Sequence, residues 1–163
     1  MNEELLEVKG LHTSFFTHLG EVKAIRDVSF SVHKGEIVGI VGESGSGKSV
    51  TSLSIMGLLS YPGRVTGGQI MFKGEDLTRL SKSRMRKIQG NQISMIFQDP
   101  MTSLNPVFTV GQQIAESLEL HENLTKSQAW EKAEEMLELV GIPKERAIEY
   151  PHQFSGGMKQ RVI

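Results

Sequence analysis

The front of the chain alternates apolar and polar positions in the way that strands with one buried face do. Residues 5–8 and 28–32 are rich in β-branched and other apolar side chains and are predicted as strands. Residues 34–36 form a predicted turn, and residues 37–41 are a short apolar run. Such a run is typical of a strand that is covered on both faces. The pattern therefore predicts a sheet in this part of the chain.

A helix and two further strands are predicted beyond the glycine- and serine-rich segment 42–47. From Lys48 onward apolar residues recur at helical spacing, and the Pro-Gly pair at 62–63 is expected to end that helix. A pair of glycines opens a predicted strand over residues 69–73, and residues 92–97 are predicted as a second buried strand. The chain up to about residue 100 is therefore predicted to be strand-rich and of the α/β class.

Beyond residue 106 the pattern becomes helical. Residues 109–120 and 125–140 each begin with a Thr that is followed three residues later by a Gln, which is a capping-box arrangement. In the second of these segments the apolar residues fall on one face, with Lys and Glu opposite. The predicted organisation is one domain over residues 1–163, with a strand-rich part at 1–100 and a helical part at 101–163.

The strongest motif is a phosphate-binding loop, since residues 42–49 match G-x-x-x-x-G-K-[ST] at every position. Glycines let successive backbone N–H groups turn toward a triphosphate, and the helix that follows adds unpaired N–H groups and a positive dipole end. Lys48 offers a charge to the β- and γ-phosphates, and the hydroxyl of Ser49 offers an oxygen ligand to Mg²⁺. The candidate nucleotide-binding residues here are Gly42, Glu43, Ser44, Gly45, Ser46, Gly47, Lys48, Ser49 and Val50.

The competing interpretation of this segment is an ordinary glycine-rich turn, which the full motif and its strand–loop–helix setting make improbable. The motif by itself does not indicate what the nucleotide drives, because kinases, GTPases, helicases and transporters share it. A GTPase would also carry an N-K-x-D segment, which this sequence lacks.

Composition narrows the range of partners. Eighteen Lys and Arg nearly balance nineteen Asp and Glu, so the net charge of −1 gives no general attraction to nucleic acid or acidic lipid. The basic run 82–87 contains no aromatic residue and is interpreted as a solvated face, so no nucleic-acid partner is predicted. The absence of cysteine excludes disulfides and thiolate metal sites. The acidic N-terminus does not resemble a signal peptide, and no apolar run approaches the roughly 20 residues that span a bilayer.

A second motif lies near residue 163. Ser155-Gly156-Gly157 followed by Gln160-Arg161 resembles the signature sequence of ABC ATPases, in which a serine and two glycines open a helix. The local chemistry is again that of an anion site, with a serine N-cap and exposed N–H groups, although an ordinary loop is the alternative. The resemblance implies that two subunits face each other, and that Ser155, Gly156 and Gly157 of one subunit close over the ATP of the other.

Two further positions resemble ABC sites. Gln98, which follows the predicted strand 92–97, resembles the glutamine loop, whose carboxamide ligates Mg²⁺ and orients water; an ordinary polar strand end is the alternative. Phe15 and Phe16 lie upstream, where ABC ATPases place an aromatic residue that stacks on adenine; Phe15 is favoured, and a place in the core is the alternative for either. The resemblance thus implies ATP and Mg²⁺ as cofactors, Lys48 and Gln98 as catalytic residues, and Ser49 and Gln98 as metal ligands.

The amino-acid sequences of residues 42–58, 95–106 and 150–158 are similar to those of dipeptide and oligopeptide importer ATPases, and this resemblance covers essentially the whole chain. It implies a RecA-like P-loop core with an N-terminal antiparallel β subdomain and a helical signature subdomain. It also implies a second ATP-binding subunit, two membrane-spanning permeases, an external peptide-binding protein, and a peripheral location on the cytoplasmic face of the inner membrane. Residues after Gln98 are expected on the permease-facing surface. An importer of another solute such as nickel, and a non-transport ABC ATPase, are the alternatives.

ABC ATPases continue past the signature into a strand that ends in Asp-Glu and then to a switch histidine. The sequence to Ile163 contains neither, and neither Asp99 nor His152 lies in the right context to replace them. The 163 residues by themselves are therefore expected to bind ATP weakly and not to hydrolyse it. The missing strand is expected beside residues 37–41, where its absence would expose apolar surface.

Overall fold

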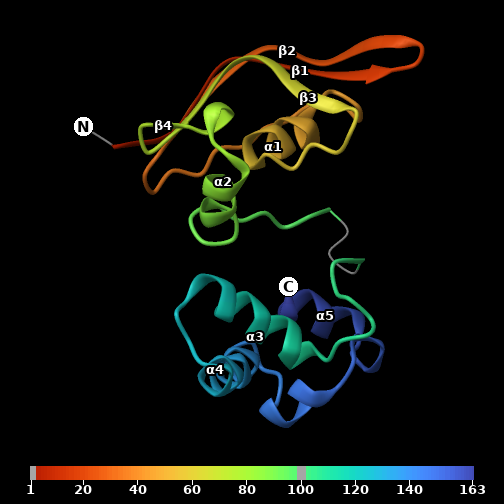
Figure 1. Cartoon of the computed structure of the whole chain (residues 1–163). Coiled ribbons are helices and arrows are strands. Elements are labelled where there is room, and N and C mark those ends of the chain that lie inside the picture. Colours follow the sequence, from red (N-terminus) through yellow and green to blue (C-terminus); the bar gives the residue numbers. More distant parts are fainter. Residues whose placement is uncertain (1–2, 99–101) are drawn as a thin grey trace. The chain divides into compact units, whose positions relative to one another are not determined.

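The computed structural model describes residues 3–98 and 102–163 of this chain. The chain divides into two compact units, Met1–Gln89 and Gly90–Ile163, and each is described by itself. In Figure 1 the first unit runs from red to green and the second from green to blue. Asp99, together with the Pro-Met pair that follows it in the importer-like segment, lies outside the described residues.

Antiparallel strands in the order β2-β1-β3-β4 form the sheet of the first unit. The strands are β1 (Glu4–Thr17), β2 (Gly20–His33), β3 (Gly63–Phe72) and β4 (Glu75–Asp76). The predicted strands at 5–8 and 28–32 lie within β1 and β2 and are confirmed in position, and the predicted strand at 69–73 coincides with the end of β3 except that β3 ends one residue earlier, at Phe72. The real strands are longer, because β1 pairs with β2 along the whole hairpin as far as its turn.

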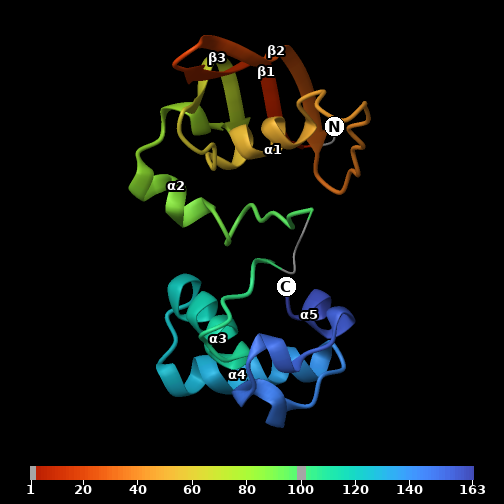
Figure 2. The ribbon, with the colours of Figure 1, turned by 90° about the vertical axis from the view of Figure 1, so that its right-hand side faces the viewer.

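Helix α1 (Lys48–Met56) packs against β1, β2 and β3, as Figure 2 shows. It ends at Gly57, not at the Pro-Gly pair as predicted, because Gly57 adopts a left-handed backbone with φ 63° that stops the helix. The 3₁₀ turn η1 (Leu77–Arg79) and helix α2 (Lys82–Ile88) complete the unit, so the basic run is helical. The buried apolar side chains of the first unit include Val8, Leu11, Ile25, Ile55, Ile70, Phe72 and Ile88.

Two predicted strands are absent from the structure. Residues 37–41 and 92–97 do not form strands of the sheet, and Ile37, Val41 and Ile96 are 98%, 93% and 77% exposed. A strand exists only where neighbouring backbone pairs with its N–H and C=O groups, and among the described residues no strand lies beside either segment. The predicted burial of these segments is therefore wrong, whereas the expected exposed apolar surface is present at 37–41.

The second unit is helical. It contains α3 (Val110–His121), α4 (Lys126–Leu139), the 3₁₀ turns η3 (Lys144–Ile148) and η4 (Pro151–Gln153), and α5 (Gly156–Val162). Both predicted capping boxes are present, with Thr109 and Thr125 each paired with the Gln three residues later.

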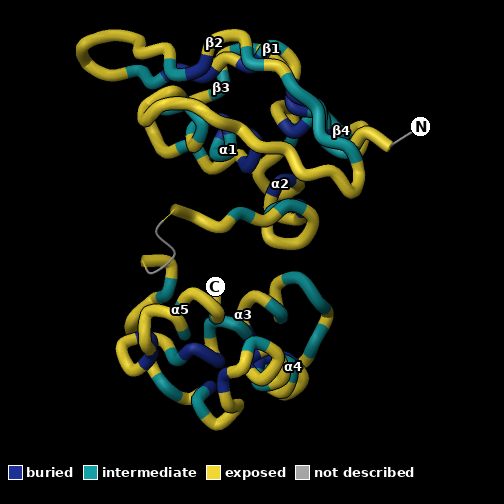
Figure 3. The backbone as a smooth tube through the Cα atoms, turned by 180° about the vertical axis from the view of Figure 1, so that it is seen from behind, coloured by how far each residue is buried: buried dark blue, intermediate teal, exposed yellow. Residues whose placement is uncertain are grey.

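The core of the second unit lies between α3, α4 and the segments that follow them, as the dark blue parts of Figure 3 show. One buried cluster consists of Val110, Leu137, Ile142, Ala147 and Phe154. In a second cluster the small side chains of Ala115, Ala129 and Ala133 meet. Because these side chains are short, α3 and α4 can approach closely there. In the part of the chain that the structure covers, no helix is both long and apolar enough to cross a membrane.

Candidate nucleotide-binding site

The phosphate loop, residues 42–49, has the backbone that its glycines permit. Gly45 and Gly47 have φ angles of +82° and +95°, which L-residues rarely adopt. At Gly42 an added Cβ would lie 2.7 Å from Ser46 Oγ, so a side chain there would require the Ser46 hydroxyl to rotate away. The loop is therefore a tight turn that brings its own backbone close to the start of α1.

The first turn of α1 presents free backbone amides. The N–H of Thr51 is the first in the helix to bond, to the carbonyl of Gly47 at 2.8 Å. Over residues 3–98 and 102–163, no acceptor bonds to the N–H groups of Lys48, Ser49 or Val50, and the N-cap Gly47 has no side chain to do so. Ser49 is exposed, and its hydroxyl has no hydrogen-bond partner in the same described stretches. Such a helix end attracts anions.

The side chain of Lys48 folds back over the loop. Its Nζ donates to the carbonyls of Gly42 and Glu43, both at 2.7 Å, while Ser46 Oγ lies farther away at 3.4 Å. An ammonium group has three donors, so two hold it at the loop and the third is only weakly used. The positive charge is thereby fixed next to the free amides, and this donor set fits a phosphate chain.

The two candidate aromatic residues have different surroundings. The Phe15 ring packs on the backbone of Gly63. The contact is so close that a Cβ added at Gly63 would lie 2.6 Å from Phe15 Cε1. The guanidinium carbon of Arg64 lies 4.1 Å from the centre of the Phe16 ring, in a cation–π contact. Consecutive strand residues point to opposite faces of the sheet, so the two rings do not share a face. One face of Phe16 is thus already occupied by a cation.

The signature segment opens α5. Ser155 is the N-cap of this helix, and its Oγ accepts a hydrogen bond from the N–H of Met158 at 3.4 Å. Arg161, in the same helix, donates from Nη1 to the carbonyl of Val140 at 2.8 Å and so ties α5 to the end of α4. Gly156 and Gly157 lie in the first turn of the helix. The serine cap that the sequence predicts is therefore present.

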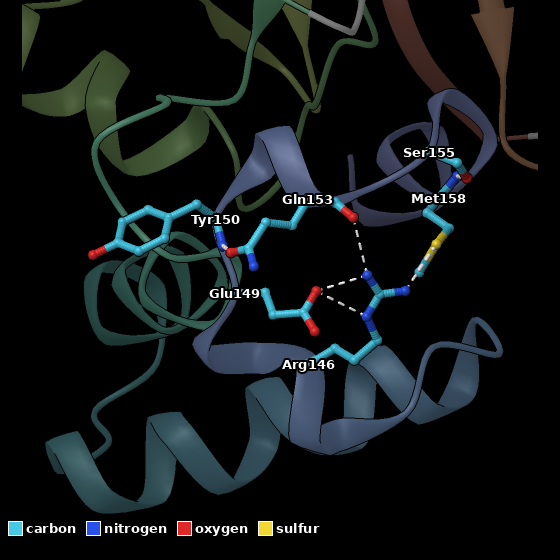
Figure 4. Close-up of polar contacts among 6 residues, drawn as sticks. All are labelled: Arg146, Glu149, Tyr150, Gln153, Ser155 and Met158. Atoms are coloured by element: carbon cyan, nitrogen blue, oxygen red, sulfur yellow. Dashed lines mark hydrogen bonds and ion pairs between the residues drawn. The ribbon is translucent and has the colours of Figure 1, made fainter.

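Arg146 contacts residues within and just before the signature segment, and it was not predicted from the sequence. Its guanidinium donates to Glu149 Oε2 at 2.6 and 2.9 Å and to the carbonyl of Gln153 at 3.0 Å (Figure 4). It also contacts the sulfur of Met158 at 3.2 Å and lies 4.7 Å from the Phe154 ring centre. The hydrogen bonds with Glu149 raise the pKa of Arg146, so it is always charged. The i,i+3 spacing of Arg and Glu was the only sequence signal.

The two units divide the predicted site residues between them. Residues 42–50 and Phe15 lie in the first unit. Gln98, which is exposed and lies in an irregular segment, belongs to the second unit together with Ser155, Gly156 and Gly157. The helix start with the N-cap Gly47 thus lies in the first unit, and the helix start with the N-cap Ser155 lies in the second.

The second unit also contains a cavity of 630 Å³ beside α3. Ser103, Leu104, Asn105, Phe108, Gln113 and Ser117 are among the residues that line it. Gln113 holds the loop before α3, since its Nε2 donates to the carbonyls of Asn105 and Phe108 at 3.0 and 3.1 Å. This cavity wall therefore has a defined shape.

A family model and curated relatives of this chain both point to ABC transporters. A family model described as ABC transporter matches residues 25–163. The chain is 57% identical to the dipeptide transport ATP-binding protein DppD of Bacillus subtilis (strain 168), over 99% of this chain and 49% of that protein. It is 50% identical to the oligopeptide transport ATP-binding protein OppD of Escherichia coli (strain K12), over 99% of this chain and 48% of that protein. The chain thus spans about half the length of these curated relatives.

Among solved structures, the chain is similar to a dimeric ATP-binding cassette, MJ0796, in a post-hydrolysis state bound to ADP and Pi. The TM-score is 0.81 at 25% sequence identity, and the match covers 97% of this chain and 66% of that one. The predicted fold class, an ABC ATPase fold in which an antiparallel sheet is combined with helices, is confirmed by this match.

Proposed function

Because this chain belongs to the ABC transporter family, we propose that residues 42–50 bind the triphosphate of MgATP. The observation that carries the proposal is the position of Lys48, whose ammonium group is held by two loop carbonyls beside the free amides of α1. This arrangement offers a phosphate chain a full charge and several N–H donors at once. Bound ATP would supply the free energy for transport.

The residues proposed to bind Mg²⁺ and the base are assigned from their chemistry and from the resemblance of this chain to ABC ATPases. Ser49 offers Mg²⁺ a hydroxyl that has no hydrogen-bond partner among the described residues, and Gln98 offers it a neutral carboxamide oxygen. Phe15 is the proposed residue to stack on the base, because it contacts the uncharged backbone of Gly63, whereas a cation, Arg64, covers one face of Phe16. These residues hold and orient the nucleotide and its cation.

We also propose that Ser155, Gly156 and Gly157 close over the ATP held by a second ATP-binding subunit. Support comes from the serine-capped start of α5 and from the dimeric cassette that this chain resembles. Within one chain the two helix starts would then serve different nucleotides, so nucleotide binding would join two subunits. ATP hydrolysis is proposed as the reaction coupled to transport, with Lys48 and Gln98 among its catalytic residues.

The transported solute is proposed to be a dipeptide or oligopeptide, since the relatives named above are dipeptide and oligopeptide transport proteins. The subunit would then act on the cytoplasmic face of the inner membrane with two permease subunits and, indirectly, a peptide-binding protein. The cavity lined by Ser103, Leu104, Asn105, Phe108 and residues of α3 is proposed as the surface that binds a permease segment. Its loop is held by Gln113, so the surface is formed before any partner binds.

Replacing Lys48 with alanine tests the nucleotide site. The expected loss of ATP affinity is about 2–5 kcal/mol, the range for removing one partner of a close charge pair. Lys34→Ala is the control, because the Lys34 side chain is 75% exposed and its one ion pair within residues 3–98 and 102–163 is with Glu3, at 3.5 Å. Isothermal titration of both variants with MgATP measures the difference. Equal affinity of wild type and Lys48→Ala would refute the assignment.

Nucleotide-dependent association with a pair of peptide permeases tests the transport role. Pull-down of the permeases in MgATP and in buffer alone should differ for the wild type and should not differ for Lys48→Ala. Association that does not depend on the nucleotide would contradict the coupling proposed here, while leaving ATP binding itself intact.

A further inference from the structure

A buried pair of hydroxyl groups joins the sheet of the first unit to α1. Thr13, in β1, and Ser54, in α1, are 0% and 4% exposed. Their hydroxyl oxygens lie 2.9 Å apart and are hydrogen-bonded to each other. Valine in place of Thr13 and alanine in place of Ser54 would be of similar size and would bury no hydroxyl group. The presence of the two hydroxyl groups at a packed helix–sheet contact requires an explanation.

The pair leads directly to the phosphate loop. Ser54 Oγ also donates to the carbonyl of Val50 at 2.7 Å, in the first turn of α1. One turn earlier on the same side of the helix, Thr51 Oγ1 donates to the carbonyl of Gly47 at 3.0 Å. Thr13 is thus connected through Ser54 to the turn that carries the free amides.

The hydroxyl pair is also connected to Phe15, because Thr13 and Phe15 both lie in β1. Thr13 and Phe15 are two residues apart in β1 and so lie on the same face of the sheet. The pairing of β1 with β3 is continuous here, from Thr13 with Val65 to Phe15 with Gly63, without a bulge between them. The pairing of β1 with β2 shifts register between Thr13 and Ser14, so it is the pairing with β3 that links the position of Thr13 to that of Phe15.

A hydroxyl pair constrains this contact more than apolar packing does. Dispersion and burial tolerate small sliding of a helix over a sheet, whereas a hydrogen bond weakens steeply outside its distance and angle range. If α1 moved along β1, Ser54 would keep its hydrogen bond to the Val50 carbonyl, whereas the buried Thr13 hydroxyl would lose its bond to Ser54. That state is costly, because a buried polar group without a partner keeps its full desolvation penalty.

We propose that Thr13 and Ser54 are positioning residues for nucleotide recognition. They set the register of α1 on β1, so that the phosphate loop and the Phe15 ring engage one ligand that carries both a base and a triphosphate. The pair thereby favours nucleoside triphosphates over a bare polyphosphate. This inference rests on the proposed function, in which the loop binds phosphates and Phe15 stacks on the base.

The test compares ATP with inorganic tripolyphosphate, which has the phosphates and lacks the base. Thr13→Val keeps the size of the side chain and removes the hydroxyl. We expect it to weaken ATP binding about 10-fold, the scale of one base–aromatic stacking contact, and to leave tripolyphosphate binding unchanged within about twofold. Isothermal titration of the 163-residue chain measures both affinities.

Three companion variants make the test specific. Thr13→Ser restores the hydroxyl and should restore ATP affinity. Ser54→Ala removes the partner hydroxyl with a good helix former and should reproduce the result of Thr13→Val, so the test stands even if the valine variant fails to fold. Thr51→Val alters a hydrogen bond of the loop itself and should weaken both ligands by a similar factor.

The outcomes separate this inference from the proposed function. If the wild type binds neither ligand, the nucleotide site itself is refuted, and the inference is refuted with it. If the wild type binds both, and Thr13→Val and Ser54→Ala weaken both equally or neither, the pair has only a structural role. Loss of ATP affinity alone, with rescue by serine, is the result that the positioning role requires.

Discussion

Replacing Gly47 with alanine tests whether the backbone of this glycine shapes the phosphate loop. Gly47 has φ 95° and ψ 0°, and an added Cβ would lie 3.1 Å from the carbonyl oxygen of Ala24. The left-handed backbone costs an alanine roughly 1–2 kcal/mol. Contact with a backbone oxygen that cannot rotate away adds about 1 kcal/mol more. The expected loss in the free energy of unfolding is thus about 2–3 kcal/mol.

Gly45→Ala is the matched control. Gly45 is also left-handed, with φ 82°, but an added Cβ would meet nothing within 4 Å. Only the conformational cost of roughly 1–2 kcal/mol applies there. The Cβ at Gly47 would also lie 3.6 Å from Ile25 Cγ1, which is an ordinary van der Waals distance, so the difference between the stabilities of the two variants mainly measures the close approach of the loop to Ala24.

Urea unfolding followed by far-UV circular dichroism is the assay. Tryptophan fluorescence would not serve, because the single tryptophan, Trp130, lies in the second unit. The stability order should be wild type, then Gly45→Ala, then Gly47→Ala, and tripolyphosphate affinity should follow the same order. A Gly47→Ala variant as stable as wild type, or more stable than Gly45→Ala, would refute the reasoning.

Two other predictions concern charged groups. Arg146→Met should lower the urea midpoint of the second unit, read from Trp130 fluorescence, because Glu149 and the Gln153 carbonyl lose their donors; an unchanged midpoint would show that Arg146 does not brace the signature segment. The pKa of Glu75 lies below its ordinary value of 4.5, because Arg84 donates two hydrogen bonds to its carboxylate. The stabilisation is therefore present above pH 4.5 and is lost as pH falls through the lowered pKa. Thermal melts of wild type and an Arg84→Met variant should diverge at neutral pH and converge in acid; a constant difference would contradict the pair.

Features of this protein that depend on near neighbours in the chain could be predicted from the sequence. The capping boxes at Thr109 and Thr125 pair residues three apart, so a Thr and a Gln at that spacing suffice to form them. The phosphate loop has the same character, since Lys48 reaches carbonyls only five and six residues away. Chain connectivity already holds such groups close together, and the sequence alone therefore located the candidate site.

What only the tertiary structure decided depends on segments far apart in the chain. Residues 37–41 have the composition of a buried strand, yet pairing needs a neighbouring strand and not a composition, and none lies beside them among the described residues. Thr13 and Ser54 are forty-one positions apart, and no local pattern shows that their hydroxyls meet. The guanidinium of Arg146 reaches Met158, twelve residues on, because the chain turns through η3 and η4. Such contacts follow from the packing of whole elements, which the order of residues does not display.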